Sequence, residues 1–324
     1  MAAHIITILT MPIHIIGVYC ILWKTPGQMK GIQFNILQVH LLTMVFDLFI
    51  TFLEIPFLLL PYFIFYPLGI IRFLGTPNVL HIVALVINTG CLGIAMISIL
   101  ENRFNVFCAF YSPKLTSLWI KLRRPWLVTH YLLGIFGLTP FYMFVPDQEK
   151  AIKRIFRNFS CLPDYIYKAP FFVLAEDYTF HLLSWVTYLL LCNGEGALFM
   201  IFLVYNSGKQ LVSKTMSKKS YEMQKSFLLG LLIWFSVVVL FIGLPMAYAG
   251  FSMAFDYYNQ AFTNTGVIIG FTHGIVSTVT MIWVHRPYRD AVLKIFWSRG
   301  KLDSMERSSR SHRTINVMPR ASGL

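Results

Sequence analysis

The chain has 324 residues, of which 56% are hydrophobic and 13% carry charge. Soluble domains average about 45–50% apolar and about 25% charged residues, so this composition excludes an ordinary soluble domain, and also disorder, coiled coil and collagen. The formal net charge of +13 would suggest a nucleic-acid partner in a soluble protein. Here the basic residues lie between apolar runs, which indicates a membrane protein that contacts lipid and binds no nucleic acid.

Seven apolar runs are long enough to cross a bilayer, because a hydrocarbon core about 30 Å thick needs about 20 residues of helix. The predicted spans are 5–23, 36–63, 79–101, 126–146, 179–204, 226–250 and 262–284. Pro56 and Pro61 are expected to kink or end the second run. The first run has no basic region before it and no cleavage site after it, which favours a retained span over a signal peptide; a signal anchor is the alternative. The predicted fold is an all-α membrane protein with a seven-helix bundle over residues 1–297.

Lysine and arginine are concentrated in alternate connectors. The segments after the first, third, fifth and seventh runs hold 21 of the 27 basic residues. Basic residues in short loops stay cytoplasmic, so we expect an outside N-terminus and an inside C-terminus. The one N-glycosylation sequon, Asn158-Phe159-Ser160, falls in a loop assigned outside, which makes Asn158 a candidate glycosylation site.

The C-terminal region changes character twice. Residues 287–297 form an amphipathic stretch that is predicted to lie on the inner leaflet. Residues 298–324 are basic and serine-rich with little to bury, so we predict a disordered cytoplasmic tail. Phosphorylation of the tail is one interpretation, and a solvated tail near anionic lipid is the other.

Three ionisable residues of the second run share one face of its helix. His40, Asp47 and Glu54 are seven residues apart each time, which is nearly two helical turns. An ionisable group inside a membrane is costly, so this face should point into the bundle, with His273, Ser277 and Thr278 of the seventh run as possible partners. The network is either a switch that changes partners between two states or a static cluster that holds helices together. The role of Glu195, between two glycines, stays open.

Signatures of catalysis and of metal or nucleotide binding are missing from the sequence. There is no paired-histidine zinc spacing, nucleophile elbow, P-loop or dinucleotide fingerprint. We therefore expect no catalytic residues, no metal and no cofactor. Tyr248, Phe251 and Tyr257 are candidates for a small-molecule pocket on the outer side, and the alternative is that they belong to the aromatic belt at the membrane edge.

Two junctions resemble those of G-protein-coupled receptors. Glu101-Asn102-Arg103 at the inner end of the third run is similar to the acidic-x-Arg element of such receptors, in which a carboxylate beside the arginine holds an inactive arrangement. His285-Arg286-Pro287-Tyr288-Arg289 follows the seventh run. Together with strings such as Lys24-Thr25-Pro26-Gly27-Gln28-Met29-Lys30 and Tyr257-Tyr258-Asn259-Gln260-Ala261, they resemble the nematode serpentine chemoreceptors, most closely class H (Srh) in the Str group.

The resemblance covers residues 12 to 296 and implies a function. It implies a chemoreceptor in the plasma membrane of a sensory cilium, which binds an odorant or soluble chemical and activates a heterotrimeric G protein. Glu101, Asn102, Arg103, His285, Pro287, Tyr288 and Arg289 would then form the coupling and switch region.

The chain also departs from the family pattern. The N-terminal segment is shorter than expected, which suggests a truncated gene model. Trp234 and Val238 replace an expected glutamine and proline in the sixth run, which removes one source of a kink. The stretch from Thr76 to His81 has no cysteine for the usual outer disulfide.

Two other functions compete with the receptor interpretation. A secondary transporter would use the acids of the second run as an ion or proton relay, but an odd helix count and the lack of paired broken helices argue against it. A pore subunit would need a filter motif, and none is visible.

Overall fold

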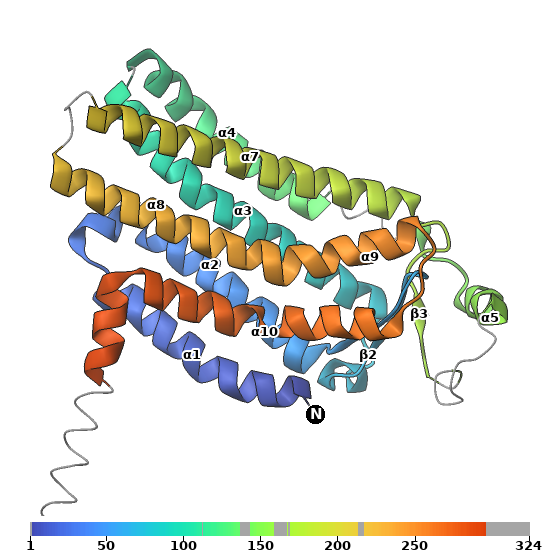
Figure 1. Cartoon of the computed structure of the whole chain (residues 1–324). Helices are drawn as coiled ribbons and strands as arrows, with labels where there is room; N and C mark the ends of the chain where they lie inside the picture. The colour runs from blue at the N-terminus through green and yellow to red at the C-terminus, as the bar shows by residue number, and fades with distance from the viewer. Residues whose placement is uncertain are drawn as a thin grey trace, which may run out of the picture.

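The computed structural model describes residues 2–111, 113–136, 143–158, 167, 169–212 and 217–295. The long helices are α1 (Ala2–Lys24), α2 (Lys30–Leu48), α3 (Asn78–Tyr111), α4 (Pro113–Phe136), α7 (Thr179–Val212), α8 (Lys218–Val238), α9 (Leu244–Ala254) and α10 (Gln260–Val284). They form an elongated bundle (Figure 1). A further helix covers residues 286–295. The predicted tail, 298–324, lies outside the described residues, as do the last two positions of the amphipathic stretch.

Six membrane-length apolar helices occur in the described part of the chain. They are Ala2–Lys24, Lys30–Leu53, Asn78–Val106, Thr179–Lys209, Lys225–Ala254 and Gln260–Val284. The fourth predicted span is not among them, because the first half of α4 carries Lys114, Lys121, Arg123 and Arg124 and residues 137–142 lie outside the described part. Large apolar side chains such as Ile8 (72% exposed) and Leu190 (70% exposed) cover the bundle surface, as expected for contact with lipid.

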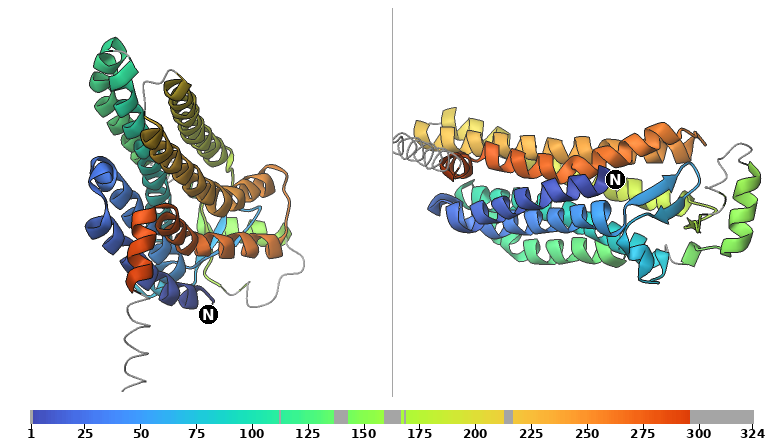
Figure 2. Two further views of the ribbon diagram at one scale, coloured as in Figure 1. Left: turned by 60° about the vertical axis from the view of Figure 1, so that its left-hand side comes forward. Right: turned by 90° about the horizontal axis from the view of Figure 1, so that it is seen from below.

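The connectors of the bundle are sorted between its two ends. The turns between α1 and α2 and between α3 and α4 lie at one end, together with the helix of residues 286–295 (Figure 1). The N-terminus, the strands and α5 (Gln148–Asn158) lie at the opposite end (Figure 2). The connectors that the sequence shows to be rich in lysine and arginine therefore share one end, which we call the basic end.

The second span ends earlier than predicted. Helix α2 passes into a π-helical segment, η2 (Phe49–Leu53), and strand β1 (Pro56–Leu59) follows. Proline has no backbone N–H for a helix, so a helix over 36–63 was wrong beyond Leu53, although the expected helix end near Pro56 is confirmed. The all-α prediction also missed a small sheet, in which β2 (Ile64–Pro67) pairs antiparallel with β1 and with β3 (Phe172–Val173).

The sheet is covered by the amphipathic helix α5. Ala151 and Ile155 of α5 pack against Leu59, Ile64 and Val173 of the strands. The helix begins after Asp147, whose Oδ1 accepts a hydrogen bond from the backbone N–H of Lys150 at 3.3 Å. This hydrogen bond lowers the pKa of Asp147. The strands and α5 thus form a cap over the end opposite the basic end.

The helix of the sixth span is interrupted just after Val238, the position at which the sequence lacks the proline that was expected to kink it. A π-helical segment, η5 (Val239–Gly243), separates α8 from α9, and Pro245 follows at the start of α9. The ribbon changes direction at this junction (Figure 1). π-Bulges and prolines are recognised causes of kinks, so the π segment provides a kink without a proline at Val238.

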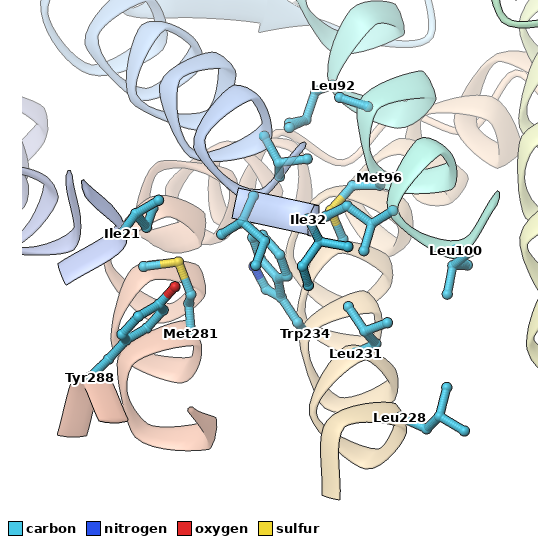
Figure 3. Packing of buried hydrophobic residues seen from close by; sticks show 14 of the residues in the cluster. Ile21, Ile32, Leu92, Met96, Leu100, Leu228, Leu231, Trp234, Met281 and Tyr288 are labelled. Carbon is cyan, nitrogen blue, oxygen red and sulfur yellow. The ribbon is translucent and has the colours of Figure 1, made fainter. Parts of the chain in front are cut away.

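The largest hydrophobic core in the described part of the chain lies towards the basic end and joins α1, α2, α3, α7, α8 and α10 with the helix of residues 286–295. Ile21 of α1, Ile32 of α2, Met96 of α3, Trp234 of α8 and Met281 of α10 are buried in one cluster. Figure 3 shows these side chains converging, with Tyr288 beside Met281 and Ile21. This core fixes the relative positions of the helices that carry the buried polar residues.

Candidate functional site

A buried polar cluster joins α1, α2 and α10. Nε2 of His14 donates to Oδ2 of Asp47 at 2.8 Å, and both side chains are fully buried. The second ring nitrogen of His14 lies 3.0 Å from Oγ1 of Thr278. His40 donates from Nε2 to the backbone carbonyl of His14 at 3.1 Å. We call His14, His40, Asp47 and Thr278 the central cluster.

Two glycines make room for the central cluster. A Cβ on Gly274 would lie 1.2 Å from Oδ2 of Asp47, and one on Gly17 would lie 2.6 Å from the ring of His40. Real Cβ atoms do not approach other atoms so closely, so these side chains lie directly on the backbones of α10 and α1. Small residues allow such close approach of membrane helices, and the cluster depends on both glycines.

His40, Asp47 and Glu54 of the predicted face are all buried, but Glu54 lies outside the central cluster. The π-helical segment Phe49–Leu53 lies between Asp47 and Glu54 and changes the helical register. Glu54 is 1% exposed and lies 3.5 Å from Nδ1 of His81 on α3. Nε2 of His81 lies 2.6 Å from Oγ1 of Thr76.

The expected partners on α10 are all buried, but they do different things. Ser277 accepts a hydrogen bond from Nε1 of Trp234 at 2.6 Å, which joins α10 to α8. His273 has no hydrogen-bond partner within the described residues, and its ring lies against that of Phe46, 6.1 Å between centroids. Of the three, only Thr278 belongs to the central cluster, through its contact with His14.

Glu101 does not lie against Arg103. Its Oε1 accepts from Nε1 of Trp119 at 2.8 Å, and its Oε2 accepts from Nη2 of Arg123 at 3.0 Å. Glu101 is 4% exposed. The spacing in the sequence suggested a carboxylate beside the arginine, but residues two apart on a helix point in different directions, and the carboxylate instead joins α3 to α4.

Arg103 faces α8. Its guanidinium carbon lies 4.0 Å from the centroid of the Phe227 ring, a cation–π contact. The Phe227 ring stacks against His285, with 6.0 Å between centroids, and His285 lies edge-on to Tyr288 at 5.4 Å. The hydroxyl of Tyr288 lies 2.7 Å from Oγ1 of Thr25 at the end of α1. We call this series of contacting residues the inner relay; its members are Arg103, Phe227, His285, Tyr288 and Thr25.

The remaining predicted coupling residues surround the inner relay. Asn102 donates to Oδ1 of Asn35 on α2 at 3.5 Å. Arg289 lies over the ring of Trp283 at 5.7 Å. Pro287 lines a surface groove beside the end of α1. The structure thus places the residues after α10 next to α1 and α8, at the same end as Arg103.

Glu195, whose role the sequence left open, has a partner on α4. Its carboxylate oxygens lie 3.1 and 3.0 Å from Nε2 of His130. The other ring nitrogen of His130 donates to the carbonyl of Trp126 at 2.8 Å. This contact joins α7 to α4.

The aromatic residues predicted for a pocket lie on α9, which carries Tyr248 and Phe251, and on the turn before α10, which carries Tyr257. The hydroxyl of Tyr248 donates to the carbonyl of Asn259 at 3.1 Å. Phe251 is 49% and Tyr257 41% exposed, and their rings are 6.0 Å apart. Such exposure fits a membrane-edge belt as well as a pocket.

Asn158, the candidate glycosylation site, is the last residue of α5, and the rest of the sequon lies outside the described residues.

Asp177, two residues before the first residue of α7, bonds to the backbone in an Asx-type turn. The carboxylate of Asp177 accepts from the backbone N–H of Thr179 at 2.9 Å. Hydrogen bonding from Thr179 lowers the pKa of Asp177.

Within the described part of the chain, no three histidine, cysteine or carboxylate side chains converge to hold a metal ion.

Comparison with known families matches nearly the whole chain. The model of the family "Serpentine type 7TM GPCR chemoreceptor Srh" matches residues 1–298. The chain belongs to the Srh family. It is also similar to serpentine receptor class H-72 of Caenorhabditis elegans, with 22% identity over 307 residues that cover 90% of this chain and 84% of the relative. The resemblance read from the short strings is confirmed, and this multi-pass Srh protein is a receptor and not an enzyme.

His14 is the functional candidate that the sequence did not reveal. No spacing pattern in the sequence connects His14 to Asp47, 33 residues later. A lone histidine in an apolar helix offers one usable signal, namely that such a residue needs a polar partner inside the bundle.

Proposed function

We propose that this Srh chemoreceptor binds a small environmental chemical on the capped side of the bundle and activates a heterotrimeric G protein at the basic end. The inner relay is the observation that supports coupling most directly. Its contacts join Arg103 of α3 to Phe227 of α8, and Phe227 to His285 after α10. The inner ends of these three elements would have to separate on activation. A ligand acts by binding one arrangement more tightly than another, and the equilibrium shifts by that difference alone.

The central cluster supports a two-state mechanism. It joins α1, α2 and α10 in a region where an unpaired charge is costly. Asp47, His14 and Thr278 each have a specific partner, so movement of α10 relative to α2 would force an exchange of partners. We propose that the central cluster holds one arrangement of the bundle and that the outer ligand favours another.

The proposed location is the plasma membrane, in a sensory cilium, with residues 1–297 forming the receptor domain. The basic end then faces the cytosol, as the distribution of lysine and arginine favours.

We expect a tag at the C-terminus to be reached by antibody only after cells are permeabilised, and a tag at the N-terminus in intact cells. Asn158→Gln should remove one glycan and raise gel mobility. Detection of both tags in intact cells would contradict this orientation.

The receptor function is tested by separating signalling from transport. We expect cells that express the chain to give a calcium response to at least one chemical in a panel of volatile and water-soluble odorants. Purified receptor with that chemical should accelerate nucleotide exchange on a G protein. Uptake of the chemical into vesicles without a G protein, and no nucleotide exchange, would instead support a transporter that uses Asp47 and Glu54.

A further inference from the structure

A groove of about 430 Å³ lies at the basic end, between the last turns of α1 and the helix of residues 286–295. Its walls include Tyr19, Lys24, Pro287, Asp290, Lys294 and Ile295. Figure 1 shows the helix of residues 286–295 turning away from α10 beside the end of α1. Buried Tyr288 holds this helix against α1 through its hydrogen bond to Thr25. The groove is therefore a built feature of the fold.

The charges of the groove favour an anion. Neither Lys24 nor Lys294 forms an ion pair among the described residues, and Nζ of Lys24 lies 5.4 Å from the centroid of the Tyr19 ring. Asp290 is the acid of the groove, and its carboxylate already lies 3.8 Å from Arg289 and 4.0 Å from Arg286. Two lysines thus remain available to one negatively charged group.

The groove also lies at the depth of lipid headgroups. Trp23 and Trp283, on the two helices that lead into it, are 67% and 64% exposed. Exposed tryptophans of membrane proteins sit at headgroup level. Leu293 on the helix of residues 286–295 is 53% exposed, as expected for an amphipathic helix with its apolar face in the membrane. A headgroup and the start of its acyl chains match the mixture of lysines and apolar walls.

The C-terminal tail of the chain is a poor candidate for the occupant of the groove. Residues 296–324 carry six basic and two acidic residues, so the lysines of the groove would repel the tail. Basic pockets between membrane helices on the cytoplasmic side bind anionic headgroups. We propose that this groove binds the phosphorylated headgroup of an anionic phospholipid from the leaflet at the basic end.

The test compares two double variants with the same loss of charge. Full-length receptor in neutral detergent micelles is titrated with fluorescent phosphatidylinositol 4,5-bisphosphate. Lys24→Gln with Lys294→Gln should weaken binding about 30-fold, because each lysine near a membrane surface contributes on the order of a factor of five. Lys218→Gln with Lys225→Gln, on α8 at the same end but outside the groove, should bind like the wild type. Equal binding by the two double variants would overturn the proposal.

Two further measurements keep the result interpretable. Asp290→Asn removes the acid of the groove and should tighten binding several-fold, so an unchanged or weaker affinity argues against the site even if the lysine variant folds poorly. Soluble inositol 1,4,5-trisphosphate should compete at least 10-fold more weakly than the lipid, because it lacks acyl chains. Equal competition would show that the groove takes a free phosphate compound and that membrane lipid is not its ligand.

Discussion

Gly274→Ala is expected to destabilise the receptor by about 2–6 kcal/mol. The new Cβ would lie 1.2 Å from Oδ2 of Asp47, so the carboxylate must leave its place beside His14. Leaving a buried polar group without its hydrogen bond costs about 1–3 kcal/mol, and overpacking costs about 1–3 kcal/mol more. The expected result is a much lower melting temperature in fluorescence-detected size-exclusion assays, with little receptor at the cell surface.

Gly270→Ala is the matched control for this variant. Gly270 lies one turn earlier on α10, and a Cβ there meets nothing within 4 Å. Alanine in a helix is more stable than glycine by about 0.5–1 kcal/mol, so this control should melt at the wild-type temperature or above. If the two alanine variants have the same melting temperature, the packing of Asp47 on α10 is not required for stability.

Arg103→Ala is expected to abolish ligand-dependent nucleotide exchange and to leave surface delivery intact. The guanidinium of Arg103 contacts the Phe227 ring at 4.0 Å, and a cation–π contact contributes about 0.5–2 kcal/mol, too little for its loss to unfold the bundle. The measurement is dose-dependent nucleotide exchange at matched surface expression. Normal signalling by this variant would remove Arg103 from the mechanism.

Two more variants separate the charge of Arg103 from its contact. Phe227→Leu keeps the arginine but removes the ring that joins α3 to α8, so we expect higher exchange without ligand and a retained response to ligand. Arg286→Ala removes a positive charge at the same end, from a side chain that is 84% exposed, and should signal normally. A silent Phe227→Leu receptor would show that the ring supports the active arrangement instead of the resting one.

The inner relay also changes how Glu101-Asn102-Arg103 is understood. In the sequence these three residues suggest one unit, in which the acid restrains the arginine. In the structure the acid joins α3 to α4 through Trp119 and Arg123, and the arginine joins α3 to α8 through Phe227. Neutralising Glu101 therefore acts on a different helix contact from neutralising Arg103.

The sequence by itself determined that this is a multi-pass membrane protein of helices, and it identified the Srh family. Both conclusions depend on properties that are local in the chain. Span length follows from the bilayer thickness, the sorting of basic connectors follows from composition, and the family strings are short and contiguous. The burial of His40 and Asp47 was also predictable, because a charged face in lipid is too costly.

Only the tertiary structure decided which polar groups meet. His14 and Asp47 come from different helices, Arg103 meets Phe227 across the bundle, and Glu54 leaves the face of Asp47 because a π-helical segment changes the register. None of these pairs has a fixed spacing in the sequence. Partner choice depends on where helices pack and on which glycines let them approach, and side-chain packing among many residues sets both.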